Sequence, residues 1–150
     1  MQKYQIEIRN SDIETIVMLS NKIPEFINPH QKEEYIKRME GKDSLILVAY
    51  IDNQAVGFKV GYGKTNHFYS WMGAVLPEFR KMGVAEALAN HQETYAIDQG
   101  FQEIRFKTRN GLTNMLCFGL KRGYMIIEVD QREKVEEHRI LLAKKVKGTQ

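Results

Sequence analysis

Apolar and polar residues follow two different periods along the chain, and these periods predict an alternation of strands and helices. Runs rich in apolar and β-branched residues predict strands at 4–9, 45–51, 55–62, 67–75, 103–108, 124–129 and 137–145. Apolar residues spaced three and four apart predict helices at 13–23, 29–41, 84–99 and 114–122. This order favours an α+β fold (mixed α/β), in which helices cover both faces of one sheet.

Residues with special backbone preferences are expected to set the ends of several elements. Ser11 or Asp12 should cap the first helix, and the Asn-Pro pair at 28–29 should open the second as its cap and first residue. The Asp-Asn pair at 52–53 tolerates the left-handed conformations of a tight turn, so the strands beside it should form a hairpin. Residues 148–150 are expected to fray.

Length and composition indicate a single domain over residues 1–150, because no linker, repeat or low-complexity tract divides the chain. No apolar run is long enough to span a membrane and no N-terminal signal pattern is present, so a cytoplasmic protein without a membrane partner is expected. The single cysteine, Cys117, agrees with a reducing compartment. Neither it nor the four histidines show metal-ligand spacing, so no metal is expected.

The charge distribution argues against a nucleic-acid partner. A net charge of +3 is small, and acidic residues lie between the cations. Arg105, Lys107 and Arg109 alternate with apolar residues along a predicted strand, and Lys121 and Arg122 lie at a helix end. A solvated face explains these cations better than a nucleic-acid surface.

The segment from Arg80 to Ala85 lies between a predicted strand and a predicted helix. A strand that ends in a short glycine-containing turn and opens into a helix leaves N–H groups without intrahelical acceptors. Together with the positive end of the helix dipole, these donors form a site for an anion. Gly83 has no Cβ to keep a phosphate away, and Arg80 and Lys81 add positive charge. An ordinary loop with solvated cations is the alternative.

Two common nucleotide motifs are excluded at this turn. No Gly-Lys-Ser/Thr follows it, as a P-loop would require, and a single glycine is too few for a dinucleotide fingerprint. A phosphate-bearing ligand that needs no metal fits better.

At this turn the chain resembles the GCN5-related N-acetyltransferase (GNAT) family, because Arg80, Gly83 and Ala85 match its Gln/Arg-x-x-Gly-x-Gly/Ala signature. The lead-in at 74–80, the helix and Gly-Tyr ending at 114–124 and the hairpin at 52–58 are also similar. The likeness covers nearly all of the chain and is weakest in its first part. It implies the GNAT acyl-CoA N-acyltransferase fold, with a central, mostly antiparallel and splayed sheet of about seven strands and helices on both faces.

The resemblance also implies the ligand and its binding residues. Acetyl-CoA is expected as a cosubstrate, and its pyrophosphate should meet the backbone donors of Arg80, Lys81, Met82, Gly83, Val84 and Ala85. The pantetheine arm should pair like an extra strand with Gly73 and Val75, where two central strands splay. Asn110 or Asn114 is expected to bond the arm, although a helix-capping role suits Asn114 as well.

The acceptor amine must lose a proton before it attacks the thioester. At pH 7 this costs about 4.6 kcal/mol for a lysine-like amine and about 1 kcal/mol for an α-amino group, so a base or a water led by one is expected. The resemblance makes Glu25 a catalytic candidate, because the break between the two early helices commonly lines the acceptor cleft. Tyr69 on the central strand is the second. The alternatives are that Glu25 is a surface acid and that Tyr69 belongs to the core. Nearby His67 is expected to be a solvated histidine if it has no role in catalysis.

One position departs from the family pattern. Many members carry a tyrosine in the helix before the Gly-Phe ending, placed to return a proton to the leaving thiolate, and the equivalent residue here is Gly119. Either the thiolate leaves without a dedicated acid, or Cys117 or a water serves. Cys117 is otherwise expected to be a small buried hydrophobic residue.

We therefore expect an N-acetyltransferase that acts on a primary amine of a small molecule or peptide. The alternative is a non-catalytic acyl-CoA binding or sensing module with the same fold, which Gly119 and the lack of an obvious base favour. A homodimer through the sheet edge or the C-terminal strands is left open.

Overall fold

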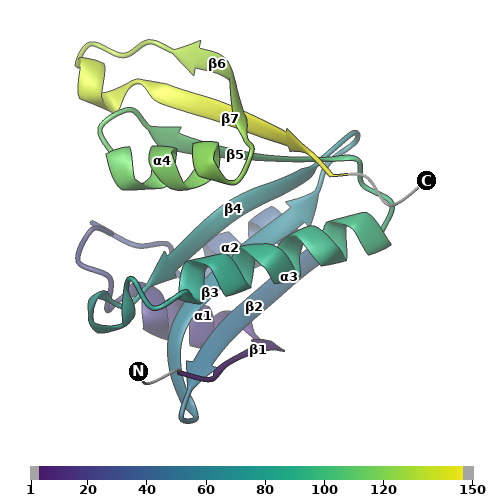
Figure 1. The fold of residues 1–150 in the computed structure, drawn as a ribbon, viewed down its shortest axis with the longest axis vertical. Helices are drawn as coiled ribbons and strands as arrows, with labels where there is room; N and C mark the ends of the chain where they lie inside the picture. Colours follow the sequence, from purple (N-terminus) through teal and green to yellow (C-terminus); the bar gives the residue numbers. More distant parts are fainter. Residues whose placement is uncertain (1–3, 147–150) are drawn as a thin grey trace.

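The computed structural model describes residues 4–146, and Figure 1 shows one open, twisted sheet with helices on both faces. The strands and α-helices in chain order are β1 (Ile6–Asn10), α1 (Ile13–Ser20), α2 (Lys32–Met39), β2 (Ser44–Ile51), β3 (Gln54–Gly63), β4 (Phe68–Val75), α3 (Val84–Asp98), β5 (Glu103–Arg109), α4 (Thr113–Lys121), β6 (Met125–Asp130) and β7 (Arg139–Lys145). The fraying expected at 148–150 lies outside the described residues.

The sheet has seven strands in the order β1-β2-β3-β4-β5-β7-β6. All neighbouring strands are antiparallel except β4 and β5, which run parallel. Since a parallel pair needs a crossover connection, α3 joins the two strands across one face of the sheet. The result confirms the expected mixed fold with a mostly antiparallel sheet.

Two hydrophobic cores hold the helices against the two faces. Val84, Leu88 and Ala96 of α3 are buried together with Phe68 of β4 and Ile104 of β5. On the other face the buried apolar side chains come from α1, α2 and strands β2–β4, and include Ile16, Leu19, Tyr35, Val48, Phe58 and Val60. In Figure 1, α3 and α4 lie in front of the sheet and α1 and α2 lie behind it. None of the helices in residues 4–146 is long and apolar enough to cross a membrane.

Several sequence predictions of local structure are confirmed. Asp12, not Ser11, caps α1, because its Oδ1 accepts from the Thr15 N–H at 2.9 Å. Asp52 and Asn53 both have positive φ, 50° and 62°, as the tight turn between β2 and β3 requires.

The expected start of the second helix is wrong. Asn28 has φ 52°, in the left-handed region, whereas an asparagine that caps a helix through its side chain has an extended backbone. The helix begins only at Lys32, after Gln31, which makes no side-chain capping bond. The preceding helix also ends early, at Ser20, so the segment between them is longer than predicted.

Candidate functional site

An open strand edge lies at the centre of the sheet. β4 pairs with β5 only at Phe68 with Ile104 and Tyr69 with Arg105. Beyond Tyr69 the two strands diverge, while β3 continues to pair with β4 on its other side as far as Val75. Trp71 has no partner in β3, because the register shifts there from Gly61–Ser70 to Val60–Met72. The splay expected from the resemblance is therefore present, and a β-bulge lies at its apex.

The backbone of β4 offers hydrogen-bonding groups to this open edge. The Leu76 N–H donates to the Val56 carbonyl at 2.8 Å, so Leu76 directs its backbone toward β3. Because backbone groups of successive strand residues point to opposite sides, Val75 and Gly73 direct theirs toward the open edge. These are the two residues expected to pair with a pantetheine arm.

The turn between β4 and α3 contains two residues with left-handed backbone conformations. Lys81 has φ 63° and Gly83 has φ 88°, and Gly83 is the N-cap, without a side-chain capping bond. The first N–H to find a helical acceptor is that of Ala87, which donates to the Gly83 carbonyl at 3.0 Å. The N–H groups of residues 84–86 therefore have no acceptor within the helix, and the helix dipole adds positive potential beside them.

Arg80 ties this turn to two other segments. Its Nη atoms donate to both carboxylate oxygens of Glu25 at 2.8 and 2.9 Å, and its Nε donates to the Val75 carbonyl at 3.0 Å. The hydrogen bonds from Arg80 lower the pKa of Glu25 to about 2. The Arg80 N–H itself donates to the Pro77 carbonyl at 3.4 Å. The guanidinium would have to exchange partners before it could contact a phosphate.

Tyr69 lies on the face of the sheet that α1 and α2 cover. Its side chain is buried, its ring packs against Tyr62, and the Lys64 ammonium lies 4.6 Å from the ring centroid. Burial raises the pKa of Tyr69. Trp71 lies nearby, with its ring centroid 5.0 Å from that of Tyr35 and the Arg38 guanidinium 4.4 Å above it. The cluster of aromatic rings around Tyr69 and Trp71, with the cations Lys64 and Arg38 stacked on it, was not predicted from the sequence.

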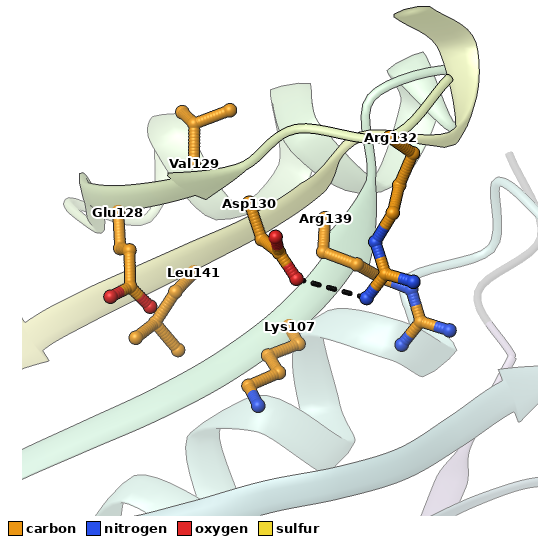
Figure 2. Close-up of a pocket in the computed structure, with 7 residues that line it drawn as sticks. All are labelled: Lys107, Glu128, Val129, Asp130, Arg132, Arg139 and Leu141. Atoms are coloured by element: carbon orange, nitrogen blue, oxygen red, sulfur yellow. Dashed lines mark hydrogen bonds and ion pairs between the residues drawn. The ribbon is translucent and has the colours of Figure 1, made fainter. Parts of the chain in front are cut away.

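A pocket of about 380 Å³ lies on the same face, farther along the sheet (Figure 2). It is lined by Lys107 of β5 and by residues of the β6–β7 hairpin, namely Glu128, Val129, Asp130, Arg132, Arg139 and Leu141. Asp130 is bound to Arg132 at 2.9 Å. Lys107 and Arg139 form no ion pair with the described residues.

Asn110 and Asn114 lie near the start of α4, and His67 lies just before β4. Asn110 binds the β6–β7 connection, because its Nδ2 donates to the Val135 carbonyl at 3.2 Å. Asn114 is exposed in the first turn of α4 and is not its cap, since Leu112 occupies that position. His67 bonds its neighbour Asn66 at 2.8 Å, and burial lowers its pKa.

Gly119 of α4 lies against β5 and β7 of the sheet. A Cβ on this residue would lie 2.7 Å from Cζ of Phe106, so the ring of Phe106 fills the space that a side chain would need. Cys117 is exposed, and the expectation of a buried cysteine is therefore wrong.

Replacing Gly119 with alanine is expected to destabilise the fold by about 1–3 kcal/mol, the usual cost of overpacking a core. Denaturant unfolding measures this change. The double variant with Phe106→Leu should recover part of the loss, because the smaller side chain leaves room for the methyl group. Strictly additive single-variant effects would contradict the contact.

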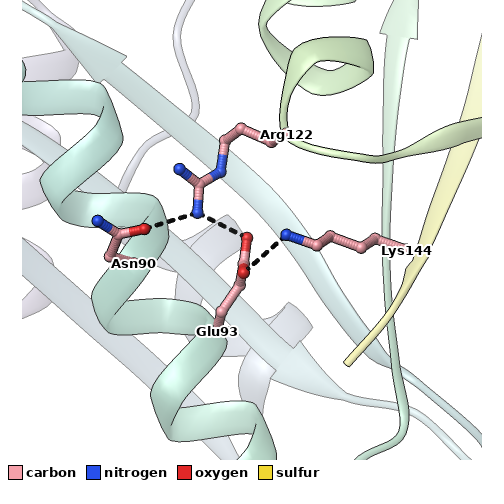
Figure 3. A network of polar contacts seen from close by, with 4 residues as sticks. All are labelled: Asn90, Glu93, Arg122 and Lys144. Atoms are coloured by element: carbon pink, nitrogen blue, oxygen red, sulfur yellow. Dashed lines mark hydrogen bonds and ion pairs between the residues drawn. The ribbon is translucent and has the colours of Figure 1, made fainter. Parts of the chain in front are cut away.

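On the face of the sheet that α3 and α4 cover, a polar network joins α3 to the C-terminal part of the chain (Figure 3). Arg122 donates through Nη2 to Asn90 and to Glu93, both at 2.8 Å, and Lys144 donates to the other oxygen of Glu93 at 2.9 Å. Although burial disfavours its charge, these bonds lower the pKa of Glu93. Sequence reasoning missed this network. It also passed over Lys59, the one charged residue in the run 54–63.

A family model and several solved structures match this chain. A family model described as the Acetyltransferase (GNAT) family matches residues 14–124. The chain is similar to the crystal structure of the ribosomal-protein-S18-alanine N-acetyltransferase from Escherichia coli, with a TM-score of 0.82, 13% identity and 97% of each chain covered.

Two further structures carry a ligand. One is a GNAT family acetyltransferase from Elizabethkingia anophelis with acetyl-CoA bound, with a TM-score of 0.73, 18% identity, and coverage of 93% of this chain and 97% of that one. The other is Arabidopsis thaliana Naa50 in complex with the bisubstrate analogue CoA-Ac-MVNAL, with a TM-score of 0.75, 16% identity, and coverage of 93% and 97%. These similarities confirm the fold that the sequence predicts.

Proposed function

The chain belongs to the GNAT acetyltransferase family, and from this premise we propose that it transfers the acetyl group of acetyl-CoA to a primary amine of a small molecule or peptide. We further propose that residues 1–150 act as a single acetyltransferase domain. Family membership supports acyl transfer in general, whereas the acceptor and the roles of individual residues belong to the proposal.

One observation carries the proposal: the open edge of β4 leads into the start of α3, where no side chain caps the N–H groups. An extended chain of amides could pair with Gly73 and with the N–H of Val75 along that edge, where the Val75 carbonyl already accepts from Arg80, and a diphosphate could meet the free N–H groups of Val84 and Ala85. Each charge-assisted hydrogen bond contributes about 1.5–3 kcal/mol, so a few such bonds suffice to hold the coenzyme. Lys81 and Met82 complete the proposed diphosphate site, and Asn110 and Asn114 flank the proposed arm.

The acceptor is proposed to enter over Tyr69 and Trp71, on the face of the sheet that α1 and α2 cover. Glu25 is a weak base, because its pKa of about 2 leaves little affinity for a proton at neutral pH. A tyrosine with a raised pKa keeps its proton, so Tyr69 would act as a hydrogen-bond donor to the substrate or to a water. An α-amino acceptor, which loses its proton at a cost of about 1 kcal/mol, therefore suits this site better than a lysine-like amine.

We propose that Glu25 serves the reaction by holding Arg80 and the loop between α1 and α2 in place. Glu25→Gln is then expected to lower kcat/KM for the acceptor by about tenfold, mainly through KM, because a neutral amide holds a guanidinium less firmly. Steady-state kinetics and the pH profile of kcat measure this effect. A loss of kcat beyond about 100-fold, with coenzyme affinity unchanged, would instead make Glu25 the general base.

The charges around the acceptor face guide the choice of acceptors to test. Lys64, Lys107 and Arg139 lie on this face and form no ion pair with the described residues. Burial and the charges of Lys107, Lys42, Arg38 and Arg105 lower the pKa of Lys64, as expected where cations gather. Amines that also carry a carboxylate, together with acidic peptides, should therefore head the panel.

The decisive experiment is an amine screen with purified protein and acetyl-CoA, followed by mass spectrometry of the product. Release of free thiol with a product heavier by one acetyl group supports the proposal. The alternative is a non-catalytic acyl-CoA sensor, which Gly119 in place of the expected tyrosine favours. Calorimetric binding of acetyl-CoA without turnover of any amine would select the sensor. The cytoplasmic location and the homodimer stay predictions.

A further inference from the structure

Lys59 lies beside the open edge of β4, on the face covered by α3. It pairs in register with Gly73, one of the two residues that direct backbone groups toward that edge. The lysine side chain passes over this glycine, with Cγ 3.5 Å and Nζ 3.7 Å from the position that a Cβ on Gly73 would take. The ammonium group is thus next to the strand position where the proposed coenzyme arm ends.

The surroundings of Lys59 hold more positive than negative charge. Arg122 and Lys144 use both oxygens of the single carboxylate, Glu93, so neither oxygen is left without a partner. Lys59 makes no hydrogen bond or ion pair with the described residues, and the Nε of Arg122 is buried without a hydrogen-bond partner. Lys59 is close enough to Arg122 and Glu93 for their charges to affect it, so positive charge exceeds negative charge here, which favours an electron-rich atom.

The lowered pKa of Lys59 is close to that of a thiol, so sulfur is a suitable electron-rich atom for this position. Burial, together with the charge of Arg122, lowers the pKa of Lys59 to about 8, while Glu93 acts in the opposite direction. A thiol has an ordinary pKa of about 8.5, so a proton can pass between an ammonium of this kind and a thiolate at little cost.

We propose that Lys59 is the catalytic residue that donates a proton to the coenzyme thiolate as the acetyl group departs. This inference rests on the proposed function. The bond from the acceptor nitrogen to the acetyl carbon forms, the bond from that carbon to sulfur breaks, and the sulfur takes a proton from the Lys59 ammonium. The acceptor nitrogen loses its proton to water, and Lys59 recovers one from solvent.

The position of Lys59 explains how the thiolate can be protonated without a tyrosine in α4. Gly119 has no hydroxyl, and the Phe106 ring excludes a side chain there. Lys59 reaches the open edge from the α3 face, whereas Tyr69 and Trp71 lie on the face packed against α1 and α2. Attacking amine and proton donor would then approach the thioester from opposite sides.

Three variants test the proposal. Lys59→Met keeps the length of the side chain without its proton, Lys59→Arg keeps the charge on a group that does not release a proton at working pH, and Lys121→Met is a control at an exposed lysine at the end of α4. Calorimetry measures acetyl-CoA affinity, which we expect to stay within about threefold of the unchanged protein in all three. Thermal unfolding establishes that each variant is folded.

We expect kcat to fall at least about 100-fold in both Lys59 variants and to be unchanged in Lys121→Met. Since the protonated form of Lys59 is required, kcat of the unchanged protein should fall above pH 8, and this alkaline limb should disappear in Lys59→Met. Full activity of Lys59→Met, or recovery in Lys59→Arg, would overturn the role of proton donor.

A readout without turnover separates this inference from the proposed function. The ammonium should lower the pKa of the thiol of bound coenzyme A, so the ultraviolet absorbance of the thiolate should appear at lower pH with the unchanged protein than with Lys59→Met. An identical titration in both would remove Lys59 from the thiol. If the unchanged protein acetylates no amine but the titrations differ, the transferase proposal fails while the contact stands.

Discussion

Replacement of Gly83 with glutamate is expected to weaken the binding of acetyl-CoA by at least about 100-fold, or about 2.8 kcal/mol. The new carboxylate would lie at the N-terminus of α3, among the N–H groups that we propose to hold the diphosphate, and like charges repel. The backbone there has φ 88°, which costs a residue with a side chain about 1–2 kcal/mol, so some stability is lost as well. Isothermal calorimetry measures the affinity.

Gly100 supplies a matched control for this variant. It follows α3 at its other end, has φ 91°, and a Cβ there would meet no atom within 4 Å. Gly100→Glu therefore introduces the same charge in a similar backbone conformation, away from the proposed site. We expect its coenzyme affinity to equal that of the unchanged protein. Equal losses of affinity in the two variants would show that strain or net charge, and not a diphosphate site at Gly83, explains the effect.

Gly61→Ala is expected to lower the free energy of unfolding by about 3 kcal/mol, at the upper end of the usual cost of overpacking. A Cβ on Gly61 would lie 2.4 Å from Cε2 of Phe68, 2.8 Å from the Tyr69 carbonyl oxygen and 3.0 Å from Nε2 of Gln92. The carbonyl oxygen belongs to the last residue pair that joins β4 to β5, so it cannot move without disturbing the apex of the splay. Denaturant unfolding monitored by circular dichroism measures the loss.

Gly73→Ala is the control for this stability effect. It adds the same methyl group within the same sheet, but its closest neighbour would be the Phe58 carbonyl oxygen at 3.4 Å, an ordinary contact. A change below about 1 kcal/mol is expected. If Gly61→Ala were as stable as Gly73→Ala, the bulge would have to relax freely around the new methyl group.

Local signals in the sequence predicted much of the fold. The hairpin turn at Asp52 and Asn53, the cap at Asp12 and the glycine before α3 each depend on the backbone preferences of one or two residues. The second helix was misplaced for the same kind of reason, because Asn28 is suited both to capping a helix and to a left-handed turn. Local preference alone does not choose between the two.

The partners of the charged residues could not be predicted in this way. Arg80 was expected at a phosphate, yet it binds Glu25, which is 55 positions away in the chain. Glu93 meets Arg122 and Lys144 across 29 and 51 positions. Such pairs form only after the sheet has brought distant segments together. The lone charge of Lys59 in an apolar run was the one visible sign of the polar site on the α3 face.

The short junction between β4 and β5 has a mechanical consequence. In residues 4–146, strands β1–β4 and strands β5–β7 are joined by only two pairs of strand residues, and the Glu93 carboxylate of α3 adds a second, polar connection to Arg122 and Lys144. A ligand bound along the open edge would add a third connection between the two groups of strands, so that its binding would stiffen the sheet there. Affinity for the coenzyme and resistance to bending of the sheet would then rise and fall together.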